Sequence, residues 1–300
     1  MVAGALKKLW KNEYFQTLTI IALEFVIVLG LYFSASAMLG AEYPALAVAS
    51  GSMLPTLNIG DLIILQKVNP AEVHADPLTG DILVYKRGNE LIVHRAVKIE
   101  LINGVYWVTT RGDNNYVNDP PWPETALVGK VIARIPYVGN LPLFFHSERN
   151  MYVFLIICLV ILVLLVLTSG SSVAEKPIKE EKKIWKINFR AASFFAINFL
   201  IVGFLIFSLW GYLEFWQPGA SPARATIFGM WKDLQFHESF SKEALLHLGF
   251  MTYRIDCQVD GGIRVGVPTF SWFQLSLLAF IMFNAWKILP LAKKRRKQNG

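Results

Sequence analysis

Cysteine and charge are both scarce in this sequence. Two cysteines in 300 residues are too few for the disulfide framework that stabilises small secreted domains. Cys158 lies in an apolar run and Cys257 in a polar segment, so we expect them at different depths and not bonded to each other. Neither has a motif around it that indicates catalysis or metal binding. The sequence therefore offers no cysteine-based function.

Charged residues make up only 17% of the chain, against about 25% in ordinary soluble domains. Hydrophobic residues reach 54% and the mean hydropathy is +0.42, which indicates membrane segments. The net charge of +7 could suggest a nucleic-acid-binding protein. However, the excess of lysine and arginine lies in three short segments beside apolar runs, which is typical of the cytoplasmic flanks of membrane spans. We therefore predict no nucleic-acid partner.

Four apolar runs are candidates for membrane-spanning helices, because about 20 apolar residues cross a bilayer. They cover residues 15–39, 151–168, 191–213 and 271–290. The first run ends in Ser34-Ala35-Ser36-Ala37, a pattern like the cleavage site of a secretory signal. Its apolar core is longer than that of a removable signal, so we favour a retained anchor.

The basic segments predict the orientation of the chain in the membrane. They are a head at residues 1–14, a linker at 169–190 and a tail at 291–300. Four spans place all three on one face, which is the cytoplasmic face by the positive-inside rule. The segments 40–148 and 214–270 are then predicted to lie outside the cytoplasm.

Residues 40–148 have the pattern of an all-β domain. Six short strand-like runs rich in Val, Ile, Leu and Tyr are separated by turn formers such as Asn103-Gly104. They cover residues 45–49, 61–68, 81–85, 91–99, 105–110 and 128–135. We expect a folded-over or barrel-like sheet with one hydrophobic core. In the segment 214–270 we predict a helix over 238–248 and strands over 251–267, and assign no chemistry.

The stretch Ser50-Gly51-Ser52-Met53-Leu54-Pro55-Thr56 is the candidate reactive element. A serine hydroxyl needs an adjacent base to act as a nucleophile. Of the three histidines in the β region, His94 lies within a strand-like run, whereas His74 is in a turn-like stretch and His146 adjoins the second span. We therefore select Ser52 and His94 as the candidate nucleophile and base.

A third group is needed to orient the base and stabilise its imidazolium form. The turn from Arg111 to Pro120 holds two aspartates, Asp113 and Asp119, six residues apart. The alternative is a calcium loop of clustered oxygen ligands, but the spacing does not match that of an EF-hand. Either aspartate could serve as the acidic partner on this reasoning alone.

The four motifs SGSMLPT, GDILVYK, HRAV and GDNNYVND, in that order after a basic-flanked anchor, resemble those of signal peptidase I. The resemblance covers residues 15–140 and is closest to the archaeal and endoplasmic-reticulum branch. The bacterial branch has a lysine base where this sequence has His94-Arg95.

The resemblance implies an acyl-transfer site without metal or cofactor. It implies Ser52 as nucleophile, His94 as general base, and Asp119 as acidic partner with Asp113 in support. It also implies an oxyanion hole formed by the Ser50 hydroxyl and the Ser52 backbone N–H. The expected partners are signal-peptide-bearing preproteins, the lipid bilayer and the protein-export machinery, at the plasma membrane or, in a eukaryote, the endoplasmic-reticulum membrane.

Two alternative functions remain open on the sequence. A related peptidase that matures surface or pilus proteins would carry the same motifs. A non-catalytic membrane assembly or transport subunit would explain the four predicted spans and Glu24 within the first of them. Such a subunit should show further polar groups facing one another inside its spans.

Overall fold

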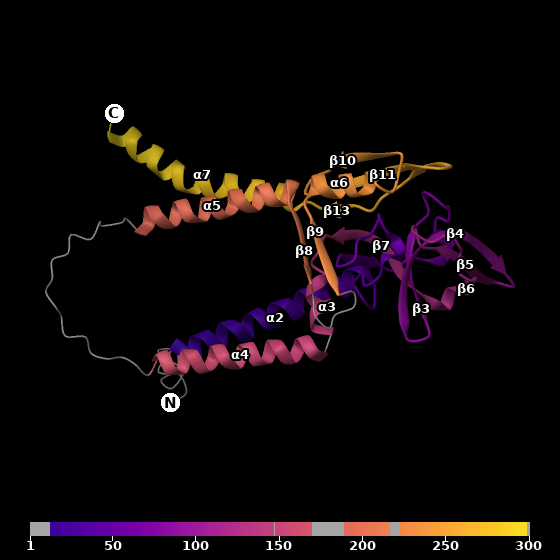
Figure 1. Ribbon diagram of the computed structural model, residues 1–300, viewed down its shortest axis with the longest axis horizontal. Coiled ribbons are helices and arrows are strands. Elements are labelled where there is room, and N and C mark those ends of the chain that lie inside the picture. The colour runs from indigo at the N-terminus through magenta and orange to yellow at the C-terminus, as the bar shows by residue number, and fades with distance from the viewer. Residues whose placement is uncertain (1–12, 147, 170–188, 217–222, 299–300) are drawn as a thin grey trace.

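The computed structural model describes residues 13–146, 148–169, 189–216 and 223–298. A region rich in β-sheet lies at one end, and the long helices extend from it toward the same side (Figure 1). These helices are α2 (Glu13–Leu39), α4 (Glu148–Ser169), α5 (Phe189–Trp210) and α7 (Trp272–Gln298). Two short helices, α3 (Asn140–His146) and α6 (Met230–Glu238), belong to the sheet end.

Among the described residues, two helices are long and apolar enough to cross a membrane, residues 15–39 of α2 and 191–210 of α5. A third is reached only if α3 and α4 are counted as one span with a bend of 97°. The prediction of four spans is therefore not supported. The run predicted at 271–290 is helical from Trp272 onward, within α7.

The predicted basic head and linker lie almost wholly outside the described residues, at 1–12 and 170–188. The side of the membrane that these segments occupy therefore stays a prediction. What the structure adds is that all four long helices leave the sheet region in one direction (Figure 1).

Helices α5 and α7 pack against each other through two polar pairs. The Asn284 side chain donates to Asn198 Oδ1 at 2.7 Å, and the Ser208 and Ser276 hydroxyls lie 3.4 Å apart. Facing small or amide side chains are a common means of helix association in lipid. These pairs are neutral and bond to one another, so they hold two helices together and do not provide a charged transport path.

One sheet of eleven strands runs through the β region in the order β10-β11-β13-β7-β3-β4-β5-β6, with β1 on β2, β2 on β7 and β12 on β11. The strands are β1 (Ala45–Ala47), β2 (Leu62–Gln66), β3 (Ile82–Arg87), β4 (Glu90–Ile102), β5 (Val105–Arg111), β6 (Trp122–Pro123), β7 (Leu127–Ile135), β10 (Glu243–Leu248), β11 (Thr252–Val259), β12 (Gly262–Arg264) and β13 (Thr269–Phe270). A separate hairpin joins β8 (Tyr212–Trp216) to β9 (Arg224–Phe228).

The six strands predicted within residues 40–148 are confirmed as β1–β5 and β7. The all-β description is too narrow, because α3 and α6 pack into the same region and β13 pairs with β7 in parallel. The sheet is thus mixed. Four residues of the segment 40–148 are buried in its main core: Met53, Leu57, Ile63 and Leu65. Val267 joins them there from residues 214–270, which we call the C-terminal segment.

The helix predicted over 238–248 is wrong. Helix α6 ends at Glu238, and Glu243–Leu248 form strand β10, which pairs with β11 along its whole length. Long-range backbone pairing outweighs the helix-compatible local sequence here. The strands predicted over 251–267 correspond to β11 and β12. The C-terminal segment therefore continues the sheet that carries the candidate site.

Candidate active site

Ser52 lies in a single turn of 3-10 helix, Gly51–Met53, that follows β1. The fully buried Met53 side chain anchors this turn in the core, while Ser52 stays partly exposed. The hydroxyl oxygens of Ser50 and Ser52 are 3.4 Å apart. The two serines selected from the sequence therefore face the same space.

The loop that follows β5 holds the Ser52 turn from behind. The Asn114 backbone N–H donates to the Ser52 carbonyl at 2.9 Å, and its side-chain amide donates to the Gly51 carbonyl at 3.1 Å. A Cβ at Gly112 would lie 2.5 Å from the Ser52 carbonyl oxygen, so only glycine permits this approach. Two of the sequence motifs, around Ser52 and around Gly112, thus meet in space.

His94 projects from β4 and is buried, with its Nδ1 2.6 Å from Asp119 Oδ2. Thr110 also donates to Asp119 Oδ2, at 2.7 Å, and Trp122 Nε1 donates to the Thr110 hydroxyl at 3.1 Å. A carboxylate accepts hydrogen bonds, so in the neutral imidazole Nδ1 carries the proton and Nε2 the lone pair. This arrangement orients a histidine to accept a proton at Nε2.

Asp119 is held in its charged form. Partial burial raises the pKa of this carboxyl, but the hydrogen bonds from His94 and Thr110 outweigh it, and the pKa lies below its ordinary value. An ionised Asp119 at neutral pH can stabilise an imidazolium on His94.

Asp113 faces a different partner. Arg95 Nε and Nη2 donate to its two oxygens, each at 2.8 Å, and the Thr56 hydroxyl donates to Oδ2 at 2.5 Å. The Asp113 side chain is only 2% exposed. Burial raises its pKa, but the bonds and charge of Arg95 outweigh burial and keep the pKa below its ordinary value. The two aspartates of the turn therefore have separate environments, one against His94 and one against Arg95.

Ser50, Ser52 and His94 line one cavity of about 800 Å³, which we call the serine cavity. Its other walls are mostly apolar and come from residues 46–49, 63, 84, 91–93 and α3, with Asn89 and Glu90 as polar residues at the wall. Among the hydrogen bonds of the described residues, none joins Ser52 to His94; such contacts often tighten only when substrate is bound. His146 also lines this cavity, whereas His74 bonds to Thr79 outside it.

The C-terminal segment reaches the site through Arg134, a buried residue that sequence reasoning missed. Arg134 forms ion pairs with Asp61, at 3.0 Å, and with Asp233 of α6. It also donates to the Thr56 carbonyl at 3.3 Å. Thr56 in turn donates to Asp113, so a continuous chain of contacts runs from α6 to the loop behind Ser52. The strand pattern of residues 128–135 gave no sign that a charged side chain would lie inside.

Known proteins give an independent comparison. No family model matches the chain. It is 35% identical over 153 residues to the human "Signal peptidase complex catalytic subunit SEC11C", covering 76% of that protein and 46% of this chain. The chain belongs to the signal peptidase I family. A Dictyostelium discoideum member, "Signal peptidase complex catalytic subunit sec11", is 34% identical over 137 residues, covering 73% of that relative and 42% of this chain. In each of the two comparisons, more than half of the present chain lies outside the aligned residues.

Proposed function

We propose that this chain is a membrane-bound serine endopeptidase that removes N-terminal signal peptides from secreted preproteins at the outer membrane surface. One observation carries the proposal: Ser52 and His94 line a single cavity, and Asp119 bonds to Nδ1 of His94, which leaves the Nε2 atom for the Ser52 proton. Membership of the family and the two apolar helices support it. The proposed setting is the plasma membrane, or the endoplasmic reticulum in a eukaryote, next to the export machinery.

The proposed reaction is acyl transfer through Ser52. His94 Nε2 takes the proton from the Ser52 hydroxyl as its oxygen attacks the carbonyl carbon of the scissile bond. His94 then gives that proton to the leaving amine of the mature chain, and Asp119 stabilises the imidazolium between these steps. Water, deprotonated by His94, hydrolyses the ester and releases the signal peptide. The Ser50 hydroxyl and the Ser52 N–H are proposed to bind the developing oxyanion.

The serine cavity suits the substrate of this reaction. Its walls include β1, which among the described strands pairs with β2 alone, so a further extended segment can add at this edge. The apolar lining by residues such as Leu46 and Val93 fits small apolar side chains before the cleavage site. The cavity is also lined by Pro142, Leu143 and His146 of α3.

Cleavage of a preprotein by the full chain in liposomes tests this function. The expected product begins at the residue after a small side chain at the end of the signal peptide, as read by N-terminal sequencing. A surface or pilus prepeptide, offered in parallel, separates the related-peptidase alternative. Cleavage of neither substrate, by protein shown to be folded, would remove the proposal.

The two aspartates are expected to respond differently to substitution. Asp119→Asn should lower kcat by roughly 10⁴-fold, because it no longer selects the productive tautomer of His94, while stability changes little. Asp113→Asn should instead lower the free energy of unfolding by about 3–5 kcal/mol, because Arg95 loses a buried charged partner. Cleavage kinetics and denaturant unfolding of both variants check this. A stable Asp113→Asn without activity, beside an active Asp119→Asn, would reverse the assignment.

The pH dependence of the free energy of unfolding is a second measure of the contribution of Asp113 to stability. The pKa of Asp113 in the folded chain lies below its ordinary value of 3.8. Its stabilising contribution is therefore complete above that ordinary value and is lost as the pH falls through the folded-state pKa. The stability difference between the wild type and Asp113→Asn should shrink below about pH 4.

A further inference from the structure

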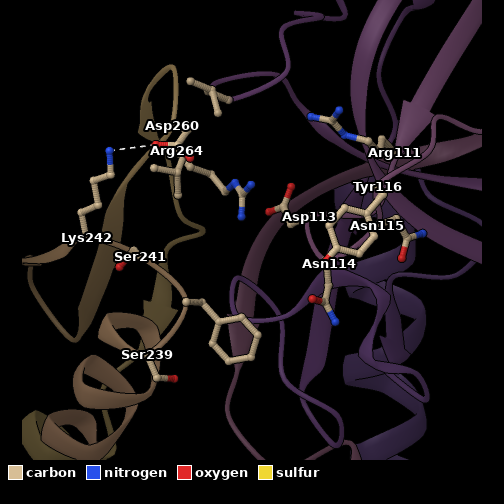
Figure 2. Close-up of a pocket in the computed structure, with 13 residues that line it drawn as sticks. Arg111, Asp113, Asn114, Asn115, Tyr116, Ser239, Ser241, Lys242, Asp260 and Arg264 are labelled. Atoms are coloured by element: carbon tan, nitrogen blue, oxygen red, sulfur yellow. Dashed lines mark ion pairs between the residues drawn. The ribbon is translucent and has the colours of Figure 1, made fainter.

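A second cavity adjoins the turn that carries Ser52. Its volume is about 660 Å³, and it lies between the loop that follows β5 and the C-terminal segment (Figure 2). We call it the arginine cavity, after Arg111 on one wall and Arg264 of β12 on the other. Asn114 borders this cavity and donates to the carbonyls of Gly51 and Ser52, so the cavity begins directly beside the nucleophile turn.

The charges of the arginine cavity do not balance. Five charged residues line it: Arg111, Lys242, Arg264, Asp113 and Asp260. Lys242 pairs with Asp260 at 2.8 Å, and the Asp113 carboxylate is already bonded by Arg95. Within the part of the chain that the structure describes, Arg111 and Arg264 have no carboxylate within ion-pair distance. Arg264 lies near enough to Asp113 for its positive charge to lower the pKa of that carboxyl, but neither Arg264 nor Arg111 forms a direct ion pair among the described residues.

Arg264 also has an unsatisfied donor. Its Nε is buried and has no hydrogen-bond partner in the described residues. A buried donor without a partner lowers stability, and an incoming acceptor would relieve that cost. Arg111 and Arg264 reach into the cavity from opposite walls, as Figure 2 shows. A planar guanidinium binds a carboxylate through paired hydrogen bonds, so the natural guest here is a carboxylate.

The position of the cavity indicates where this carboxylate would come from. The serine cavity has a largely apolar wall and is lined by residues of α3, so it suits the signal-peptide side of the scissile bond. The arginine cavity is polar and is built partly by the C-terminal segment. A substrate that passes Ser52 in an extended form would continue from the first cavity toward the second, which places the mature chain at the arginine cavity.

We propose that the arginine cavity binds an acidic side chain in the first residues of the mature protein, and that Arg264 and Arg111 thereby set a substrate preference. The inference rests on the proposed function. It assigns to the C-terminal segment a direct contact with substrate after the scissile bond. Asp113 does not oppose the guest strongly, because Arg95 neutralises its charge.

A scan of preproteins tests the inference with the full chain in liposomes. Glutamate is placed in turn at each of the first six positions after the scissile bond, with a glutamine version of each; an extended chain then reaches roughly 20 Å from Ser52. The wild type is expected to cleave the glutamate version roughly tenfold faster in kcat/KM at one or two neighbouring positions. Arg264→Gln and Arg111→Gln should each bring that ratio close to one and leave the glutamine versions unaffected.

Arg224→Gln serves as the matched control, because this arginine is exposed on β9 and lies outside the cavity. It should keep the wild-type glutamate preference. Equal cleavage of glutamate and glutamine versions at all six positions by the wild type would overturn the inference while leaving the proposed function intact. So would a preference that survives both cavity substitutions. If Arg264→Gln does not fold, Arg111→Gln decides the question alone. Failure of the wild type to cleave any preprotein would count against the proposed function itself.

Discussion

His94→Ala is expected to abolish cleavage of a preprotein, with kcat lower by roughly 10⁴- to 10⁶-fold. His94 lines the serine cavity with Ser52, its imidazole is bonded to a carboxylate at 2.6 Å, and in the proposed reaction it accepts the Ser52 proton. Without it, the serine hydroxyl stays protonated and is a weak nucleophile. Single-turnover cleavage of a preprotein in liposomes measures the loss.

His74→Ala is the matched control for this experiment. His74 is exposed and bonds to Thr79, and it does not line the serine cavity. The His74→Ala variant should cleave at the wild-type rate. If His94→Ala keeps more than about a tenth of the wild-type rate while its fold is intact, His94 is not the general base.

Asp233→Ala is expected to lower the free energy of unfolding by about 3–5 kcal/mol. The substitution removes one charged partner of Arg134 while the arginine stays buried. The Asp233 side chain is 3% exposed and also accepts from Tyr253 at 2.8 Å and from Asn58 at 3.1 Å. Burial raises the pKa of Asp233, but Arg134 and His237 outweigh it and hold the pKa well below its ordinary value. Denaturant unfolding in detergent measures the change.

The exposed pair of Lys98 and Glu100 provides the comparison. Its side chains are 61% and 47% exposed, so Glu100→Ala should cost less than about 1 kcal/mol. Asp233→Ala should also reduce cleavage, because Arg134 holds the Thr56 carbonyl and Thr56 holds Asp113 behind the Ser52 turn. If Asp233→Ala lowers the free energy of unfolding no more than Glu100→Ala does, the ion pair of Arg134 and Asp233 does not stabilise the packing of the C-terminal segment against the site.

The candidate nucleophile and base could be selected from the sequence because each sits in a distinctive local motif. Ser52 lies in a Gly-flanked turn before Pro55, and His94 lies in a strand-like run. The two aspartates could not be told apart that way. They occupy one turn, and what separates them is the packing of Arg95 and Thr110, side chains on two neighbouring strands, against different carboxylates.

The same distinction between local and long-range causes applies to the fold. Short apolar runs separated by turn formers predicted β1–β5 and β7 well, because both signals lie in the local sequence. Strand β10 was missed because its conformation is imposed by pairing with β11. Arg134 was missed for a related reason: its burial requires Asp233, which lies 99 residues further along the chain. Four spans were predicted from apolar length alone, whereas the described residues support two, or three if the bent pair α3 and α4 is counted as one.

The central claim is that Ser52 carries out acyl transfer, and cleavage of one preprotein by the wild type and by Ser52→Ala tests it most directly. Both proteins are reconstituted in liposomes at equal concentration, and their thermal unfolding is compared to show an intact fold. We expect the wild type to release the mature chain and Ser52→Ala to release none above the uncatalysed background. Cleavage by Ser52→Ala at a rate near that of the wild type would contradict the claim.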